Sequence, residues 1–237
     1  MLDKQRARNP EEKEHRKQSI VEALERLLER ELHPLPSAND IAREAGVTKG
    51  VIYFYFNTRE EIFLTLLLQI GERVFQRMLA AVQREPYDRE HVKTELITAC
   101  STHPVFMQLG LLAPGILEAN VSDGFIREFK VESGRQFENI AMAIAEHEDD
   151  IDIALCRKFF LRFYFLALYY WKHHHPPEAV VRAFQGDLPW ILQGDLRSEL
   201  SETFDWLWAG MRAAERSPQN ADAAPAPKRK AAGSARK

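Results

Sequence analysis

Apolar residues recur every three to four positions along most of the chain, which is the spacing of an amphipathic α-helix. Between Ile20 and Leu32 they fall on one helical face, while Glu and Arg occupy the opposite face. Asn9 and Pro10 suit the cap and the first turn of this helix, and Pro34 ends it. No segment of the sequence shows a convincing alternation of apolar and polar residues of the kind that forms strands, so the pattern predicts an all-α fold.

Three further helix starts follow closely on the first helix. Ser37-Ala38-Asn39-Asp40 resembles a capping box, Thr48 suits an N-cap, and Thr58-Arg59-Glu60-Glu61 is a T-x-x-E box. The predicted ends of these helices are Gly46, about Phe56, and Glu85 ahead of Pro86. The spacing therefore predicts two short helices and one long helix.

The helical pattern continues after Pro86 and divides the chain into three parts. The predicted helices cover 90–101, 103–120 with interruptions at Gly110 and Pro114, 122–147, 151–174, a short piece near 178–185, and 196–215. Residues 217–237 are rich in Ala, Pro and Lys and lack large apolar side chains. We predict a helix-turn-helix domain over 1–57, a helical-bundle domain for ligand binding and dimerisation over 58–216, and a disordered basic tail over 217–237.

Composition and charge narrow the class of protein. With 237 residues and 45% apolar content, the chain is long enough to bury a large core. Cys100 and Cys156 lie far apart, so neither a disulfide framework nor a zinc site is indicated. The most apolar run, 159–171, contains Arg162 and falls short of the roughly 20 residues of a membrane span. We expect a cytoplasmic protein with no membrane partner.

The charge is unevenly distributed along the chain. The tail holds 5 basic residues against 1 acidic residue, whereas residues 60–216 hold 16 Lys and Arg against 24 Asp and Glu. The basic character that binding to nucleic-acid phosphates requires is therefore found at the two ends of the chain. We do not expect the acidic body to bind nucleic acid. The tail's basic residues either attract DNA weakly or form a solubilising extension.

Residues 37–56 have the length and spacing of a DNA-binding helix-turn-helix. In the second of these helices, Ile52, Tyr55 and Phe56 can face the first, which leaves Lys49 and Tyr53 on the outer side. Such a helix can enter the major groove. From spacing alone, an ordinary helical hairpin with the aromatic residues in its core is an equally good interpretation.

A resemblance to a known family favours DNA binding. Asp40-Ile-Ala-Arg-Glu-Ala-Gly46-Val-Thr-Lys-Gly-Val-Ile-Tyr53-Phe-Tyr-Phe56-Asn-Thr-Arg59-Glu-Glu-Ile resembles the signature of the tetracycline-repressor (TetR) family. Val51 departs from the Thr that is common in the family, which puts one phosphate or base contact in doubt. The DNA-contacting positions that the resemblance implies are Ser37, Thr48, Lys49, Gly50, Tyr53, Tyr55 and Arg59.

The resemblance also implies a mode of action. Such a protein binds double-stranded DNA as a homodimer at a palindromic operator, usually as a repressor, and is released by a small effector. An activator would have the same chemistry. No G-x-S-x-G, H-E-x-x-H or Gly-rich phosphate loop is present in the sequence, so we expect neither an enzyme nor a cofactor.

The body is rich in aromatic residues, which suits a pocket for an apolar or aromatic effector. The alternative is that these rings only fill the core. A helix interrupted between Gly110 and Pro114 would leave irregular packing around a void, which favours the pocket. The predicted pocket residues are Phe106, Met107, Phe125, Phe129, Phe163 and Tyr164.

Two more features of the body allow more than one interpretation. The last helix carries an apolar stripe that either forms a dimer interface together with 151–174 or packs inside one subunit. The residues of this stripe are Leu200, Phe204, Leu207, Trp208 and Met211. His173, His174 and His175 are adjacent, and because successive helical residues point about 100° apart they do not converge on a metal ion.

Overall fold

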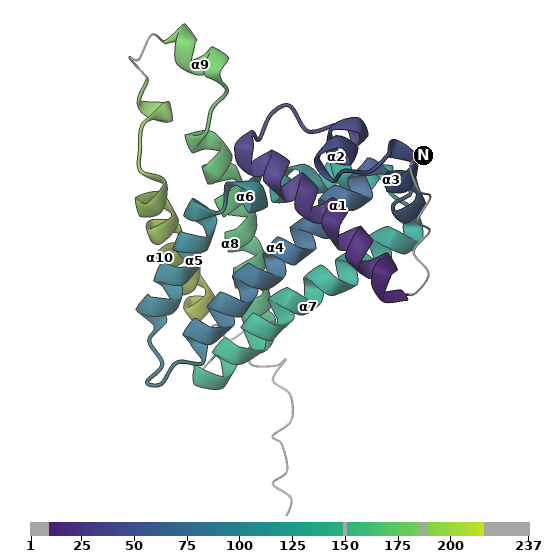
Figure 1. Cartoon of the computed structure of the whole chain (residues 1–237). Helices are drawn as coiled ribbons and strands as arrows, with labels where there is room; N and C mark the ends of the chain where they lie inside the picture. The colour runs from purple at the N-terminus through teal and green to yellow at the C-terminus, as the bar shows by residue number, and fades with distance from the viewer. Residues whose placement is uncertain (1–9, 149–150, 185–186, 188, 216–237) are drawn as a thin grey trace, which may run out of the picture.

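The computed structural model describes residues 10–148, 151–184, 187 and 189–215, and every regular element in this part of the chain is helical. The N-terminal helices are α1 (Pro10–Arg30), α2 (Ala38–Glu44) and α3 (Lys49–Tyr55). They form a small group at one side of the molecule (Figure 1). The expected cap at Asn9 and the tail 217–237 lie outside the described residues.

The body is a bundle built around one long helix, α4 (Arg59–Val82). The other helices of the body are α5 (Arg89–Thr102), α6 (Pro104–Leu112), α7 (Asp123–His147), α8 (Ile153–His174), α9 (Glu178–Ala183) and α10 (Leu196–Glu215). α4 packs against α5, α6 and α7, and α8 packs against α7 and α10. The segment that contains α9 projects from the bundle (Figure 1).

A single hydrophobic core connects the N-terminal helices to the body. α4 packs against α1 of the N-terminal group and against α7 of the body. Polar side chains also join α1 to α4: Gln18 and Gln69 exchange two hydrogen bonds of 3.3 and 2.7 Å, and Arg73 pairs with Glu25. α4 therefore belongs to both parts of the molecule.

Two predicted features of the helices differ from the structure. α4 ends at Val82, with Gln83 as its C-cap, and not at Glu85, where Pro86 disfavours helical geometry. The predicted interruption at Gly110 is wrong, since α6 continues through Gly110 to Leu112. The break lies instead at Pro114 and Gly115, where ψ of Pro114 is 121° and φ of Gly115 is 92°.

The apolar stripe of α10 packs inside the subunit, which corrects its interpretation as an interface. Leu200, Phe204, Trp208 and Met211 are buried, and the ring of Phe159 on α8 lies 5.1 Å from that of Phe204. This face of α10 is directed at α5 and α8. Trp206, on another face of the same helix, is 68% exposed.

Within the described residues, no single helix is apolar and long enough to cross a membrane. α5 together with the segment Pro104–Asn120 meets the length and composition requirement only as a pair, and the two are bent by 78° at their junction.

Candidate nucleic-acid interface and effector cavity

Ser37 fixes the start of α2. Its backbone nitrogen donates to Asp40 Oδ2 at 3.0 Å, and its hydroxyl accepts a hydrogen bond from the Asp40 nitrogen at 3.3 Å, which completes a capping box. The hydrogen bonds from Ser37 hold the pKa of the Asp40 carboxyl below its ordinary value. Because the Ser37 side chain is engaged in the cap, its predicted contact with DNA would have to compete with that cap.

The second helix of the motif presents two different faces. Ile52 and Phe56 are buried in the hydrophobic core, and α3 packs against α2, which holds α3 in place. Tyr55 is half-buried beside them, whereas Tyr53 is 46% exposed and Lys49 is fully on the outside. Of the predicted DNA-contacting residues in α3, Lys49 and Tyr53 face outward, whereas Tyr55 mainly supports the packing of the helix.

The outward face begins at Thr48, whose hydroxyl makes no capping hydrogen bond. Lys49 Nζ lies 5.8 Å from the centre of the Tyr53 ring, so the ammonium group and the phenol form one continuous surface. Gly50 lies between them and is exposed. This face combines a hydroxyl, a cation and a phenol, and Gly50 allows close approach to a duplex.

Arg59, at the start of α4, is held by other groups of the protein. Its Nη2 donates to Glu60 Oε1 at 2.9 Å, and its Nη1 donates to the Pro36 carbonyl oxygen at 3.4 Å. The guanidinium also lies 5.5 Å from the centre of the Phe63 ring. A phosphate at this position would compete with Glu60 for Arg59.

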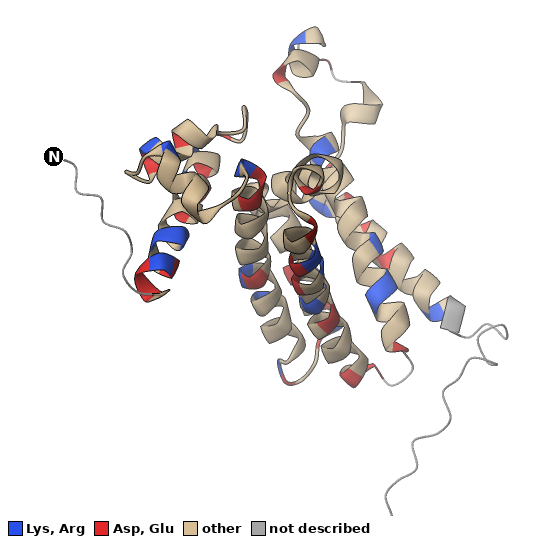
Figure 2. Cartoon of the chain, turned by 90° about the vertical axis from the view of Figure 1, so that its right-hand side faces the viewer, with Lys and Arg blue, Asp and Glu red and all other residues tan. Residues whose placement is uncertain are grey.

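Phe54 and Lys13, which were not predicted, add exposed side chains to this part of the motif, and Lys17 beside them in α1 is half-buried. Phe54 is 64% exposed, and Lys13 Nζ of α1 lies 6.0 Å from the centre of its ring. Lys17, one turn further along α1, lies 5.6 Å from the centre of the Phe56 ring. Both basic and acidic side chains lie near the start of α1 (Figure 2). Lys13 and Lys17 are four residues apart, and this spacing, which places both on one face of a helix, could have indicated them from the sequence.

In the body, a cavity of about 260 Å³ lies between α4, the break after α6, α7 and α8. Of the predicted pocket residues it brings together Phe106, Phe129 and Tyr164. Gly110 and Pro114, between which the sequence predicted an interrupted helix around a void, also line it. The other lining residues, which were not predicted, are Leu67, Leu68, Gly71, Phe75, Ala113, Glu118, Lys130, Ser133, Gly134, Gln136, Phe137, Leu161 and Phe165. The cavity therefore has aromatic walls and a few polar groups.

The remaining predicted pocket residues lie elsewhere. Phe163 lines a second, much smaller cavity of about 20 Å³, together with Cys100, whose pKa burial raises to about 12. Met107 is fully buried and Phe125 is half-buried, and neither lines either cavity. These residues have the packing expected of the core.

Comparison with protein-family models decides the family. Residues 20–66 match the model of the bacterial regulatory proteins of the tetR family, and residues 68–215 match a tetracyclin repressor-like C-terminal domain. The chain belongs to the TetR family. Proteins of this family are transcriptional regulators that bind DNA, generally in response to ligands, and are not enzymes. No curated protein matches the sequence.

Solved structures of TetR-family proteins have the same fold. A protein assigned to the family from Mesorhizobium loti has a TM-score of 0.53 at 14% identity, covering 85% of this chain and 97% of its own. A second protein, from a Shewanella species, has a TM-score of 0.52 at 19% identity, and the match covers 82% of this chain and 97% of that protein. The regulator FadR from Bacillus subtilis, solved in complex with stearoyl-CoA, has a TM-score of 0.52 at 19% identity, and the match covers 81% of this chain and 98% of FadR.

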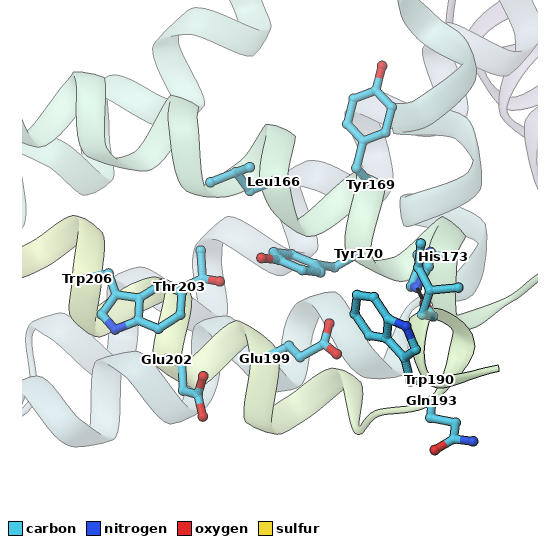
Figure 3. Close-up of a pocket in the computed structure, with 11 residues that line it drawn as sticks. Leu166, Tyr169, Tyr170, His173, Trp190, Gln193, Glu199, Glu202, Thr203 and Trp206 are labelled. Atoms are coloured by element: carbon cyan, nitrogen blue, oxygen red, sulfur yellow. Dashed lines mark hydrogen bonds between the residues drawn. The ribbon is translucent and has the colours of Figure 1, made fainter.

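This TetR-family chain also has an open groove of about 630 Å³ between α8 and α10. Tyr170 of α8 and Thr203 of α10 line it, and Trp190 lies at one end (Figure 3). Trp190 belongs to a 3-10 turn, Trp190–Leu192, in the projecting segment. The groove is lined mainly by apolar and aromatic side chains that are open to solvent.

The three adjacent histidines at the end of α8 bind three separate partners. His174 Nε2 contacts Glu199 Oε2 at 3.0 Å, and His173 Nε2 contacts the Ile191 carbonyl oxygen. His175 Nδ1 lies 2.7 Å from the carbonyl oxygen of Trp171. Their rings therefore connect α8 to α10 and to the projecting segment.

Proposed function

We propose that the protein is a ligand-responsive repressor that binds a palindromic operator as a homodimer and is released by a small apolar or aromatic effector. The outward face of α3 carries this proposal. Thr48, Lys49 and Tyr53 are exposed together, while Ile52 of the same helix and its C-cap residue Phe56 are anchored in the core. A rigid helix that presents a cation and a phenol suits insertion into the major groove.

The outer faces of α8 and α10 support a homodimer. Tyr169 is 71% exposed and Trp206 is 68% exposed, and Phe165 and Leu166 also face solvent. Leu166, Tyr169 and Trp206 line the same groove, and exposed apolar side chains gathered in this way are typical of an interface. Two helices from each subunit would form a four-helix interface, and two-fold symmetry would place two recognition helices about one turn of DNA apart.

The position of α4 supports coupling between the effector and DNA. Leu67, Leu68, Gly71 and Phe75 of α4 line the large cavity, and the same helix begins three residues after Phe56 of the recognition motif. An effector that prefers a different position of α4 would alter the separation of the two recognition helices and thereby lower DNA affinity. Stearoyl-CoA in FadR occupies a protein of the same fold, but our proposal for this chain requires only an apolar effector.

The test uses DNA from upstream of the protein's own gene. We expect a gel shift and a footprint with two half-sites about one helical turn apart, and sedimentation should give the mass of a dimer. An apolar effector should raise the melting temperature and release the DNA together. Stabilisation without release would reject the coupling, and a failure to bind any upstream DNA would reject the repressor.

A further inference from the structure

The polar groups around the large cavity are mostly engaged by the protein. Gln136 is buried, and its Nε2 donates to the Leu68 carbonyl oxygen at 3.3 Å and to Glu72 Oε2 at 3.2 Å. Ser133 Oγ donates to the Phe129 carbonyl oxygen at 2.8 Å. Neither side chain has a donor left for a ligand.

The charges at the cavity neutralise each other. Lys130 Nζ donates to Glu118 Oε1 at 2.6 Å, and both residues line the cavity. Among the lining residues these two are the charged ones. A charged group on a ligand would therefore compete with one member of this ion pair for the other, and the Lys130 side chain is 57% exposed.

The Tyr164 hydroxyl is different, because no hydrogen bond joins it to any described residue. Its position is fixed by packing: the ring lies 5.8 Å from that of Phe106 and 5.4 Å from that of Phe137. The hydroxyl oxygen rests against Gly110, where a Cβ atom would overlap it. Gly110 and Tyr164 both line the large cavity, and Tyr164 also lines the small cavity beside Cys100, so the phenol lies between the two cavities as an unused donor.

From these contacts we propose that the effector is a neutral, mainly apolar molecule with one oxygen acceptor, such as a ketone or ester carbonyl, that binds the Tyr164 hydroxyl. The proposal rests on the effector cavity proposed above and specifies its ligand. Desolvation raises the pKa of Tyr164, so the phenol remains a donor at neutral pH. A pure hydrocarbon would leave this donor unpaired, which lowers affinity.

The test compares three probes of similar size on the full chain by titration calorimetry: benzophenone, diphenylmethane and diphenylacetate. We expect benzophenone to bind up to about tenfold more tightly than diphenylmethane, which corresponds to one hydrogen bond. Diphenylacetate should bind most weakly. In Tyr164→Phe the preference for benzophenone should disappear while diphenylmethane binds as before.

Controls separate this site from general effects. Tyr87→Phe removes a phenol that lines neither cavity and should keep the preference. Gly110→Ala should displace the Tyr164 hydroxyl and reduce the preference, with circular dichroism to verify folding. The proposal is overturned if diphenylacetate binds best, if Tyr164→Phe keeps the preference, or if none of the probes binds.

A parallel DNA-release assay distinguishes the two proposals. Tyr164-dependent binding of benzophenone without DNA release would support the ligand class and reject the effector function of the cavity. DNA release by benzophenone that persists in Tyr164→Phe with unchanged potency would support the effector function and reject the hydrogen bond.

Discussion

Ile52 and Tyr53 are neighbours in the sequence but serve opposite surfaces of α3. Ile52 is fully buried, whereas Tyr53 faces solvent next to Lys49. The rotation of about 100° per helical residue produces this division. Because the buried residues hold the helix, substitutions of the outward residues should affect DNA binding and leave the fold unchanged.

Lys49→Ala and Tyr53→Ala should each weaken operator binding by about 1–3 kcal/mol, because each removes a direct contact with the duplex. Fluorescence anisotropy with labelled operator DNA measures the loss. Arg77→Ala removes an exposed cation from the middle of α4 and is the matched control, for which we expect little change. Unfolding of either α3 variant would instead indicate that these side chains belong to the core.

Glu60→Gln should strengthen DNA binding. The Glu60 carboxylate holds Arg59 at 2.9 Å and neutralises it, so its removal makes the guanidinium available to a phosphate. We expect a gain of about 0.2–1 kcal/mol, the range of a partly exposed ion pair. Anisotropy at two salt concentrations checks this. A loss of affinity would mean that Glu60 positions Arg59 for its contact.

At the scale of the helix, the caps of α2 and α3 differ. Ser37 closes a capping box with Asp40, whereas the Thr48 hydroxyl caps nothing. Because the pKa of Asp40 is lowered in the folded protein, its carboxylate contributes fully to the stability of α2 at pH values above its ordinary pKa of 3.8. This contribution is lost as the pH falls through the lowered pKa.

Ser37→Ala should therefore lower the free energy of unfolding by about 0.5–2 kcal/mol. Thr48→Ala should change stability much less and should weaken DNA binding, because its hydroxyl is free for a phosphate. Urea unfolding and anisotropy on the two variants measure both quantities. Equal losses of stability would contradict the difference between the two caps.

The elements were largely predictable from the sequence, because capping residues and apolar spacing are local signals. α7 and α8 begin within two residues of their predicted starts, and α10 has the predicted bounds. The sequence did not predict which other helices cover the apolar face of each helix. The stripe through Phe204 could have faced a partner, and only the packing of α10 against α8 and α5 assigns it to the core.

The cavity was predictable only in part for the same reason. An aromatic-rich body suggested Phe106, Phe129 and Tyr164. Gln136 gave no comparable signal, because its position at the cavity arises from the packing of α7 against α4, and Gly110 was expected only to interrupt a helix. Long-range packing of this kind has no periodicity in the chain.

For the whole molecule, the proposed dimer makes a direct prediction. Trp206→Glu should weaken self-association about tenfold or more, because a carboxylate in an apolar interface loses its hydration. Light scattering over a concentration series measures the dimer, and operator affinity should fall with it. Val131→Glu, at an exposed position of α7, is the matched control. A dimer unaffected by Trp206→Glu would place the interface elsewhere.

The contacts between α1 and α4 limit how this protein can be recombined with its relatives. A chimera that joins another regulator's first 57 residues to this body would set a foreign α1 against Gln69 and Arg73. Without counterparts of Gln18 and Glu25, the transplanted part would lose its alignment on the long helix. A working exchange of DNA specificity should therefore carry α1 and the matching face of α4 together.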